Sequence, residues 1–108
     1  MQTIVQVICD GRASLREAIV KDQRLENHRL QVSRQKIAGR NPGWAKLHSS
    51  DYEVMGAINI SWDGAAKMLV CRVVTKGASK PDELIGDFIS YLFARHRRRI
   101  KAVNILPG

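Results

Sequence analysis

Runs and alternations of apolar residues predict where the strands of this chain lie. Residues 3–9 (TIVQVIC) are β-branched and almost continuously apolar, which is typical of a strand covered on both faces. Residues 55–62 (MGAINISW) alternate between large apolar and small or polar positions, and Asp63-Gly64 separates them from an apolar run at residues 67–75. These segments predict a first strand and then a β-hairpin closed by a short Asp-Gly turn.

Helical spacing of apolar residues predicts two helices. Ser14 begins a capping-box pattern, so we place the first helix over residues 14–27. The second helix runs from its cap, Ser79, to about residue 99, with acidic residues in its first turn. Its apolar stripe consists of Leu84, Ile85, Phe88, Ile89, Leu92 and Phe93. Gly86 inside this helix predicts a close approach to the sheet, because glycine otherwise weakens a helix interior.

Three further segments complete the chain. Residues 29–37 fit either a polar edge strand, whose charges discourage pairing with other chains, or an extension of the first helix, and the sequence leaves both open. Residues 39–43 are rich in Gly, Asn and Pro, and the stretch that continues to residue 52 has neither strand nor helix periodicity, which predicts a long loop. Residues 101–106 predict a final strand.

The order of elements predicts an α+β fold. It is roughly β-α-(β)-β-β-α-β, a two-layer sandwich of an antiparallel or mixed sheet with two helices on one face. This order resembles the ferredoxin-like split β-α-β arrangement with an elaborated middle, and the resemblance rests on element order without a shared motif. The chain has 108 residues, a length that predicts a single domain over residues 1–108.

Composition excludes several classes of protein. Hydrophobic residues make up 44% of the chain, enough for a packed core without a metal or disulfide. The short apolar run at residues 68–71 cannot span a bilayer, and the first residues lack a secretory signal pattern, so we expect a cytoplasmic protein without membrane contact. Cys9 and Cys71 lie in apolar stretches without metal-ligand spacing, which predicts buried free thiols. The glycines form no phosphate-binding motif, so no cofactor is expected.

Net charge is the one unusual global property. The chain has 18 Lys and Arg against 10 Asp and Glu, a formal net charge of +8. Residues 28–48 and residues 95–101 together carry ten of the basic residues and none of the acidic ones, so the excess is confined to these two segments. Segregated positive charge is what a phosphate-binding surface requires. Opposition to a helix dipole would explain one or two cations in the second segment, but not five.

Nucleic acid, DNA or RNA, is therefore the first predicted partner. Trp44 stands between basic residues in the predicted loop, where an exposed indole would stack on bases, although a Trp that pins the loop to the core is the more common arrangement. Trp62 is predicted to lie in the core. The candidate nucleic-acid-binding residues are Arg34, Lys36, Arg40, Trp44, Lys46, Arg95, Arg97, Arg98, Arg99 and Lys101.

Candidates for catalysis are few. Asp10, His48 and His96 supply acid-base groups without a diagnostic spacing, and the adjacent residues of His48-Ser49-Ser50-Asp51 cannot take the mutual positions of a hydrolytic triad. The leading hypothesis is a small basic non-enzymatic module that binds nucleic acid through phosphate contacts. The alternatives are a protein-interaction or homo-oligomerisation module that binds an acidic partner or a second copy, and a small nuclease or other hydrolase.

Overall fold

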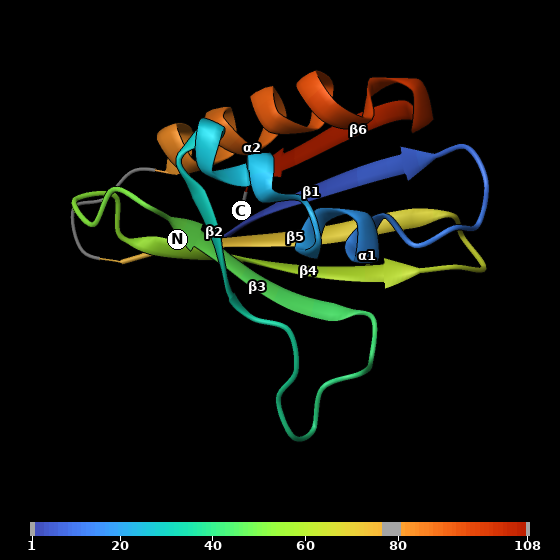
Figure 1. The fold of residues 1–108 in the computed structure, drawn as a ribbon, viewed down its shortest axis with the longest axis horizontal. Coiled ribbons are helices and arrows are strands. Elements are labelled where there is room, and N and C mark those ends of the chain that lie inside the picture. The colour runs from blue at the N-terminus through green and yellow to red at the C-terminus, as the bar shows by residue number, and fades with distance from the viewer. Residues whose placement is uncertain (1, 77–80, 108) are drawn as a thin grey trace.

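The computed structural model describes residues 2–76 and 81–107, in which six strands form one sheet (Figure 1). The elements in chain order are β1 Gln2–Cys9, α1 Leu15–Val20, the 3₁₀ helix η1 Gln23–His28, β2 Leu30–Arg34, β3 Trp44–Ser49, β4 Gly56–Asp63, β5 Met68–Thr75, α2 Pro81–His96, the 3₁₀ helix η2 Arg97–Arg99 and β6 Ile100–Pro107. The strand order is β2-β3-β4-β5-β1-β6, and every neighbouring pair is antiparallel. The predicted α+β class, with an antiparallel sheet, is confirmed.

The core is built from alternate strand residues and from the helices. In β1, for example, Val5 and Val7 are fully buried while Gln6 between them is half-buried, as the two-residue period of a strand requires. Buried residues of both helices belong to the same cluster as these strand residues: Leu15 and Ile19 from α1, and Leu84, Phe88, Tyr91 and Leu92 from α2. Burial of this apolar surface is the main source of stability.

The first predicted helix is divided in two. Its cap is confirmed, because the Ser14 hydroxyl accepts a hydrogen bond from the Glu17 N–H at 3.2 Å. The α-helix ends at Val20, however, and Asp22 caps η1 by accepting from the Arg24 N–H at 3.0 Å. Aspartate favours such local bonds over a helix interior, which explains the break.

The second predicted helix is confirmed over Pro81–His96 and continues as η2. Its predicted cap, Ser79, lies outside the described residues. The close approach predicted for Gly86 is wrong, because Gly86 is exposed and a Cβ added there would meet no atom within 4 Å. Phe93, assigned to the apolar stripe, is 40% exposed, whereas Tyr91 is fully buried.

The middle of the chain is more regular than predicted. Residues 30–34 form an edge strand, which decides between the two alternatives for this segment. The long loop predicted to reach residue 52 is wrong, because Trp44–Ser49 is strand β3 and pairs with β2 and β4. Its core-facing residues are Ala45, Leu47 and Ser49, and the small and polar members of this set hide the apolar alternation.

The predicted hairpin is confirmed as β4 and β5, with Asp63 paired to Met68. Its turn is longer than an Asp-Gly dipeptide: the Asp63 carboxylate accepts from the Ala66 N–H at 3.1 Å, and Lys67 has a positive φ of 54°. Cys9 and Cys71 are buried free thiols, as predicted. In the part of the chain described here, no helix has the length and apolar character needed to cross a membrane.

Candidate nucleic-acid interface

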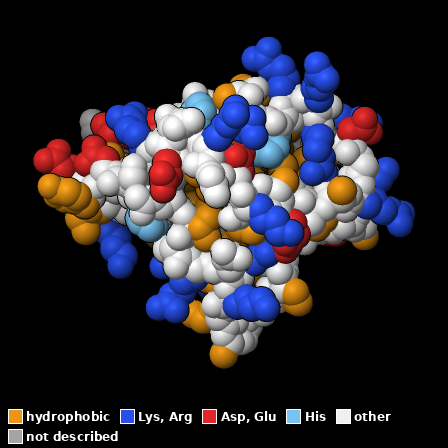
Figure 2. All heavy atoms as spheres, viewed as in Figure 1, with side chains coloured by type: hydrophobic (Ala, Val, Ile, Leu, Met, Phe, Trp, Pro, Cys, Tyr) orange, Lys and Arg blue, Asp and Glu red, His pale blue; other side chains and the backbone are white. Residues whose placement is uncertain are grey.

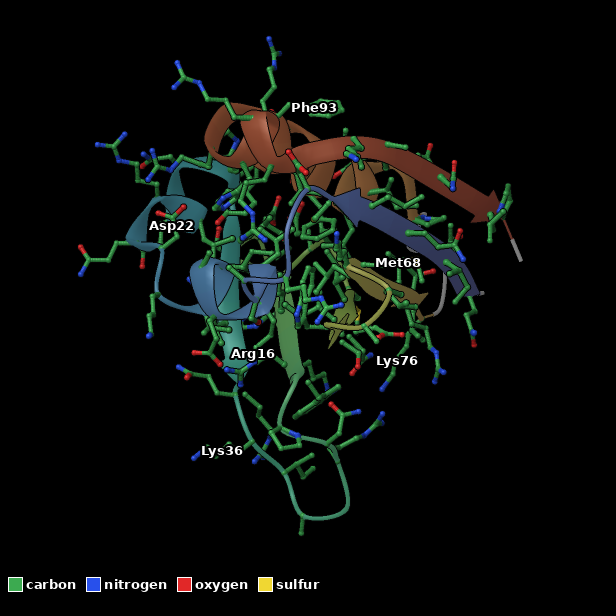
Figure 3. All side chains as sticks on the ribbon, turned by 90° about the vertical axis from the view of Figure 1, so that its right-hand side faces the viewer. Arg16, Asp22, Lys36, Met68, Lys76 and Phe93 are labelled. Carbon is green, nitrogen blue, oxygen red and sulfur yellow. The ribbon has the colours of Figure 1, made fainter. Side chains whose placement is uncertain are left out.

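The strand residues that alternate with the buried row form the other side of the sheet, called here the outer face. Figure 3 shows Met68 of this face on the opposite side of the sheet from Arg16 of α1. Strand register aligns one row of residues across the outer face: Arg34 pairs with Lys46, Lys46 with Asn59, Asn59 with Arg72, and Arg72 with Ile4. Three cations, Arg34, Lys46 and Arg72, therefore share one row, and we name them the outer-face cations.

The outer-face cations are not neutralised within the chain. None of the three forms an ion pair with any described residue. The six described strands contain a single acidic residue, Asp63, which lies at the end of β4 and bonds to the turn. Neighbouring strands are about 4.8 Å apart, so Arg34 and Lys46 face each other directly and Arg72 lies two strand spacings beyond Lys46. Such a row of like charges is unfavourable unless an anion balances it.

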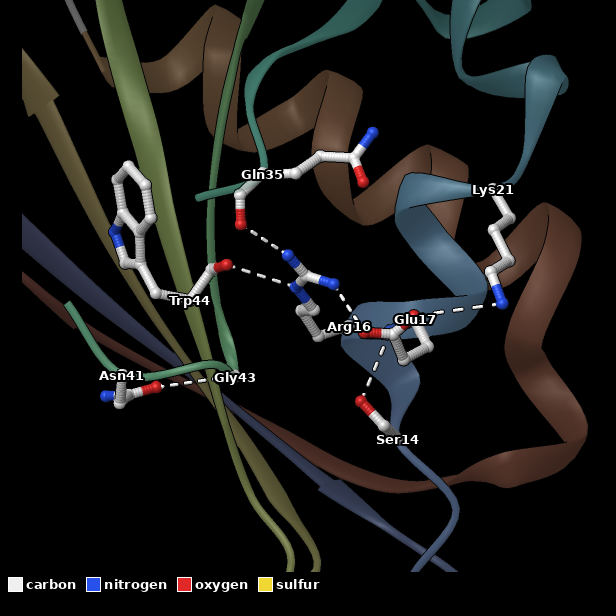
Figure 4. Close-up of polar contacts among 8 residues, drawn as sticks. All are labelled: Ser14, Arg16, Glu17, Lys21, Gln35, Asn41, Gly43 and Trp44. Atoms are coloured by element: carbon white, nitrogen blue, oxygen red, sulfur yellow. Dashed lines mark hydrogen bonds and ion pairs between the residues drawn. The ribbon is translucent and has the colours of Figure 1, made fainter. Parts of the chain in front are cut away.

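Arg16 fixes the base of the loop between β2 and β3, residues 35–43. Its Nε donates to the Trp44 carbonyl at 3.0 Å, its Nη2 donates to the Gln35 carbonyl at 2.5 Å, and its Nη1 pairs with the Glu17 carboxylate (Figure 4). The residue is 5% exposed. One guanidinium thus ties both ends of the loop to α1, and nothing in the local sequence pattern predicted this role.

The loop carries two of the candidate cations. Lys36 and Arg40 are exposed, and Figure 3 shows Lys36 on the same side of the view as Arg16, opposite Met68 of the outer face. The guanidinium of Arg40 lies 5.3 Å from the centre of the Trp44 ring, within cation–π range. With Arg34 and Lys46 on the adjoining strands, four predicted cations gather around β2, β3 and their loop.

Trp44 is not an exposed stacking platform. It is only 5% exposed, and its Nε1 donates to Asn59 Oδ1 at 3.3 Å. The ring lies on the outer face beneath Arg40 and outside the main core cluster. The burial of Trp44 supports the alternative expectation, a Trp that pins the loop. Trp62 is partly buried and packs against the core, as its phase in β4 predicted.

The second predicted cluster lies at the end of α2, and most of its members have partners inside the protein. Arg95 Nε donates to Asp22 Oδ2 at 3.0 Å, and the Lys101 ammonium lies 4.0 Å from the Asp10 carboxylate. Arg99 donates to the Ala13 carbonyl. The cations of this cluster are therefore partly neutralised by structural contacts.

The remaining arginines of this cluster are more open. Arg97 lies 5.9 Å from the centre of the Phe93 ring, and Arg98 is exposed without an ion pair to any described residue. Figure 2 shows Lys and Arg side chains over the end of α2 and, separately, around the loop between β2 and β3. The structure thus places the two predicted clusters in different regions of the molecule.

A buried polar cluster joins η1 to α2. The Tyr91 hydroxyl donates to Asp22 Oδ2 at 2.9 Å and lies 2.8 Å from His96 Nε2. His28 packs edge-on against the Tyr91 ring. With the bond from Arg95, these contacts satisfy the polar groups of Asp22 and attach α2 to the preceding segment.

The protonation of this cluster follows from its burial. Burial alone would raise the pKa of Asp22, but hydrogen bonds from a backbone N–H, Arg95 and Tyr91 outweigh it and hold the pKa below its usual value. Burial and the bond to Asp22 raise the pKa of Tyr91. Burial also lowers the pKa of His96; nearby Asp22 opposes this effect, and Arg95 and Arg99 add to it. His96 is therefore a packed, neutral member of a structural cluster.

The other acid-base candidates do not converge. Asp10 follows the end of β1, next to the β4–β5 turn, whereas His48 is at the end of β3 beside the start of β4. The length of β4 and the width of β5 separate them, so they cannot act on one bond. Ser49 Oγ accepts from the Asp51 N–H at 3.1 Å, a local turn contact. Within the described residues, no group of His, Cys, Asp and Glu is arranged to hold a metal ion.

No protein family model matches the chain, and no curated protein or solved structure is significantly similar to it. Sequence patterns located Arg34 and Lys46 but missed Arg72, whose signal is a single charge interrupting the apolar run of β5.

Proposed function

We propose that this chain is a non-enzymatic module that binds nucleic acid through phosphate contacts on the outer face of its sheet. The observation that carries the proposal is the row of outer-face cations, aligned by strand register and without acidic partners among the described residues. Each cation that neutralises a phosphate releases condensed counterions, which gives affinity independent of sequence. Arg40, whose guanidinium lies over the Trp44 ring, extends this positive surface onto the adjoining loop.

We infer that both helices cover a single face of the sheet, which leaves the outer face open to a ligand. The shared core cluster of α1 and α2 supports this arrangement. The order β4-β5-β1-β6 supports a ferredoxin-like unit, to which β2 and β3 add two strands at one edge. The addition matters for the proposal because it supplies Arg34 and Lys46, two of the three outer-face cations.

The arginines at the end of α2 have a secondary role in this proposal. Arg95 and Arg99 already donate to Asp22 and to a backbone carbonyl. A phosphate would have to compete with these bonds. Arg97 and Arg98 remain available as peripheral contacts, since their side chains are exposed. Lys101 also remains available, because its pair with Asp10 is long, at 4.0 Å, and both side chains are mostly exposed to solvent.

The test is a titration of a labelled mixed-sequence oligonucleotide, followed by fluorescence anisotropy at several salt concentrations. The slope of log affinity against log salt reports the number of phosphates neutralised, about 0.7 to 0.9 per contact. Replacement of Arg34, Lys46 and Arg72 by Gln should lower the slope by about 2 and weaken binding at low salt. No binding by the wild type at low salt would refute the proposal.

A matched variant controls for net charge. Replacement of Arg97, Arg98 and Lys101 by Gln removes the same charge from the end of α2. Because these residues are peripheral in the proposal, this variant should retain most of the slope. Equal losses in the two triple variants would show that overall charge, not the outer face, determines binding.

Self-association is a second candidate function, favoured by one observation. Strand β6 is at the edge of the sheet, and Ile105 and Leu106 on it are each 47% exposed. An exposed apolar edge strand can pair with the same strand of a second copy. Sedimentation equilibrium over a range of protein concentrations tests this, and Leu106→Lys should reduce any dimer. A monomer at all concentrations would exclude it.

A further inference from the structure

The outer face contains an open cavity of about 560 Å³ beside the loop between β3 and β4. Such a volume lies in the range of small-molecule sites. Its lining includes side chains from β2, β3, β4, β5 and the loop between β3 and β4: Gln31, Lys46, His48, Asn59, Val74 and Tyr52. They come from four strands and one loop, so the cavity is part of the sheet surface and adjoins the outer-face cations.

The lining combines apolar surface with polar side chains. Val74 and the nearby Ala57 are partly buried and contribute apolar surface. His48 Nδ1 is buried without a hydrogen-bond partner among the described residues, so His48 would meet a ligand through its other ring nitrogen, Nε2. Asn59 uses its Oδ1 to accept from Trp44, which leaves its amide N–H groups for another acceptor. A flat heteroaromatic ring with a hydrogen-bonding edge suits this combination.

Charge favours a ligand that also carries phosphate. Lys46 and Lys76 line the cavity, and no acidic side chain is among its lining residues in the described part of the chain. Asp51 and Glu53 lie in the adjoining loop, where the Asp51 carboxylate accepts from the Glu53 N–H. Lys46 is also one of the outer-face cations, so a single strand could place its phosphates on the row and one base in the cavity.

Tyr52 supplies an aromatic ring at this site. It lines the cavity and is 90% exposed, an unusual state for an aromatic side chain. Bases of single-stranded nucleic acid stack on such rings, and every base has a face that can do so. Tyr52 thus has the exposure that Trp44 lacks.

We propose that the cavity binds one unstacked base of single-stranded nucleic acid, with Tyr52 stacked on the base and His48 and Asn59 bonded to its edge. The inference rests on the proposed function, because the phosphate row brings the strand to the sheet. It adds a preference for single strands, since a base inside a duplex cannot reach the cavity.

The experiment compares a labelled single-stranded oligonucleotide with the duplex of the same sequence, on the wild type and on Tyr52→Ala. The wild type should prefer the single strand. Tyr52→Ala should weaken single-strand binding by about ten- to a hundredfold and leave duplex binding and the salt slope unchanged. Phe93→Ala removes an exposed aromatic ring elsewhere and should change neither affinity. Thermal unfolding verifies that both variants are folded.

The outcomes separate the two proposals. Salt-dependent binding with equal affinity for single strand and duplex, unaffected by Tyr52→Ala, overturns the base site and leaves the phosphate interface standing. Absence of binding to either oligonucleotide overturns both. A loss in His48→Ala that depends on which base is offered would support recognition of the base edge, whereas a loss of duplex binding in Tyr52→Ala would count against the site.

Discussion

The buried guanidinium of Arg16 offers the sharpest test of how the loop between β2 and β3 is held in place. Arg16→Gln removes the cation that donates to the carbonyls of Trp44 and Gln35. Hydrogen bonds from charged groups contribute about 1.5 to 3 kcal/mol each, and an unsatisfied buried acceptor is costly. The bond to Trp44 is buried and the bond to Gln35 is partly exposed, so we assign the second bond a contribution at the low end of this range.

The pair with Glu17 adds little, because that carboxylate is 48% exposed and solvent screens it. The expected loss in the free energy of unfolding is therefore about 3 kcal/mol. With a urea m-value of roughly 1.5 kcal/mol/M for a chain of this size, the midpoint should fall by about 2 M. Urea unfolding followed by circular dichroism measures this shift.

Two control variants test whether the loss comes from the guanidinium of Arg16. Arg24→Gln removes an exposed arginine from η1 and should change stability by less than about 0.5 kcal/mol. Arg16→Lys keeps the charge but loses the planar fork, so it should fall between the wild type and Arg16→Gln. A loss below about 1 kcal/mol in Arg16→Gln would show that water replaces the guanidinium and that the loop does not depend on it.

Three further predictions concern stability. Gly86→Ala should raise the free energy of unfolding by up to about 1 kcal/mol, because Gly86 is exposed in α2 with open space around it, and a destabilised variant would contradict this. Gly56→Ala should destabilise by more than about 1 kcal/mol, since Gly56 has a φ of 141° and an added Cβ would lie 2.5 Å from the Val74 carbonyl oxygen; an unchanged midpoint would contradict this. Because burial lowers the pKa of His96, the unfolded chain takes up its proton first as the pH falls, so stability should decline below about pH 6.5. His96→Gln should flatten that decline in urea unfolding at a series of pH values, and an unaltered pH profile would mean that another group causes it.

Local patterns in the sequence were sufficient for elements whose apolar residues repeat with a clear period. β1, the β4–β5 hairpin and α2 were predicted because their burial follows a period of two or of 3.6 residues. The buried thiols of Cys9 and Cys71 followed from the same apolar runs. Strand β3 was missed, because its core-facing side includes small and polar residues. The neighbouring strands bury these residues, whereas the sequence of β3 alone does not show an apolar alternation.

The sequence by itself also determined that positive charge is concentrated in two segments, but only the tertiary structure decided which cations face the same way. Arg34, Lys46 and Arg72 share a row because strand register aligns them, and a slip of one residue in any strand would turn its cation toward the core. Arg95, by contrast, is drawn to Asp22, a residue distant in sequence. Trp44 is buried because Arg40 and Asn59 cover and bond to it after β3 and β4 pair. Pairings between distant segments depend on packing over the whole chain, and a local pattern of residues does not contain them.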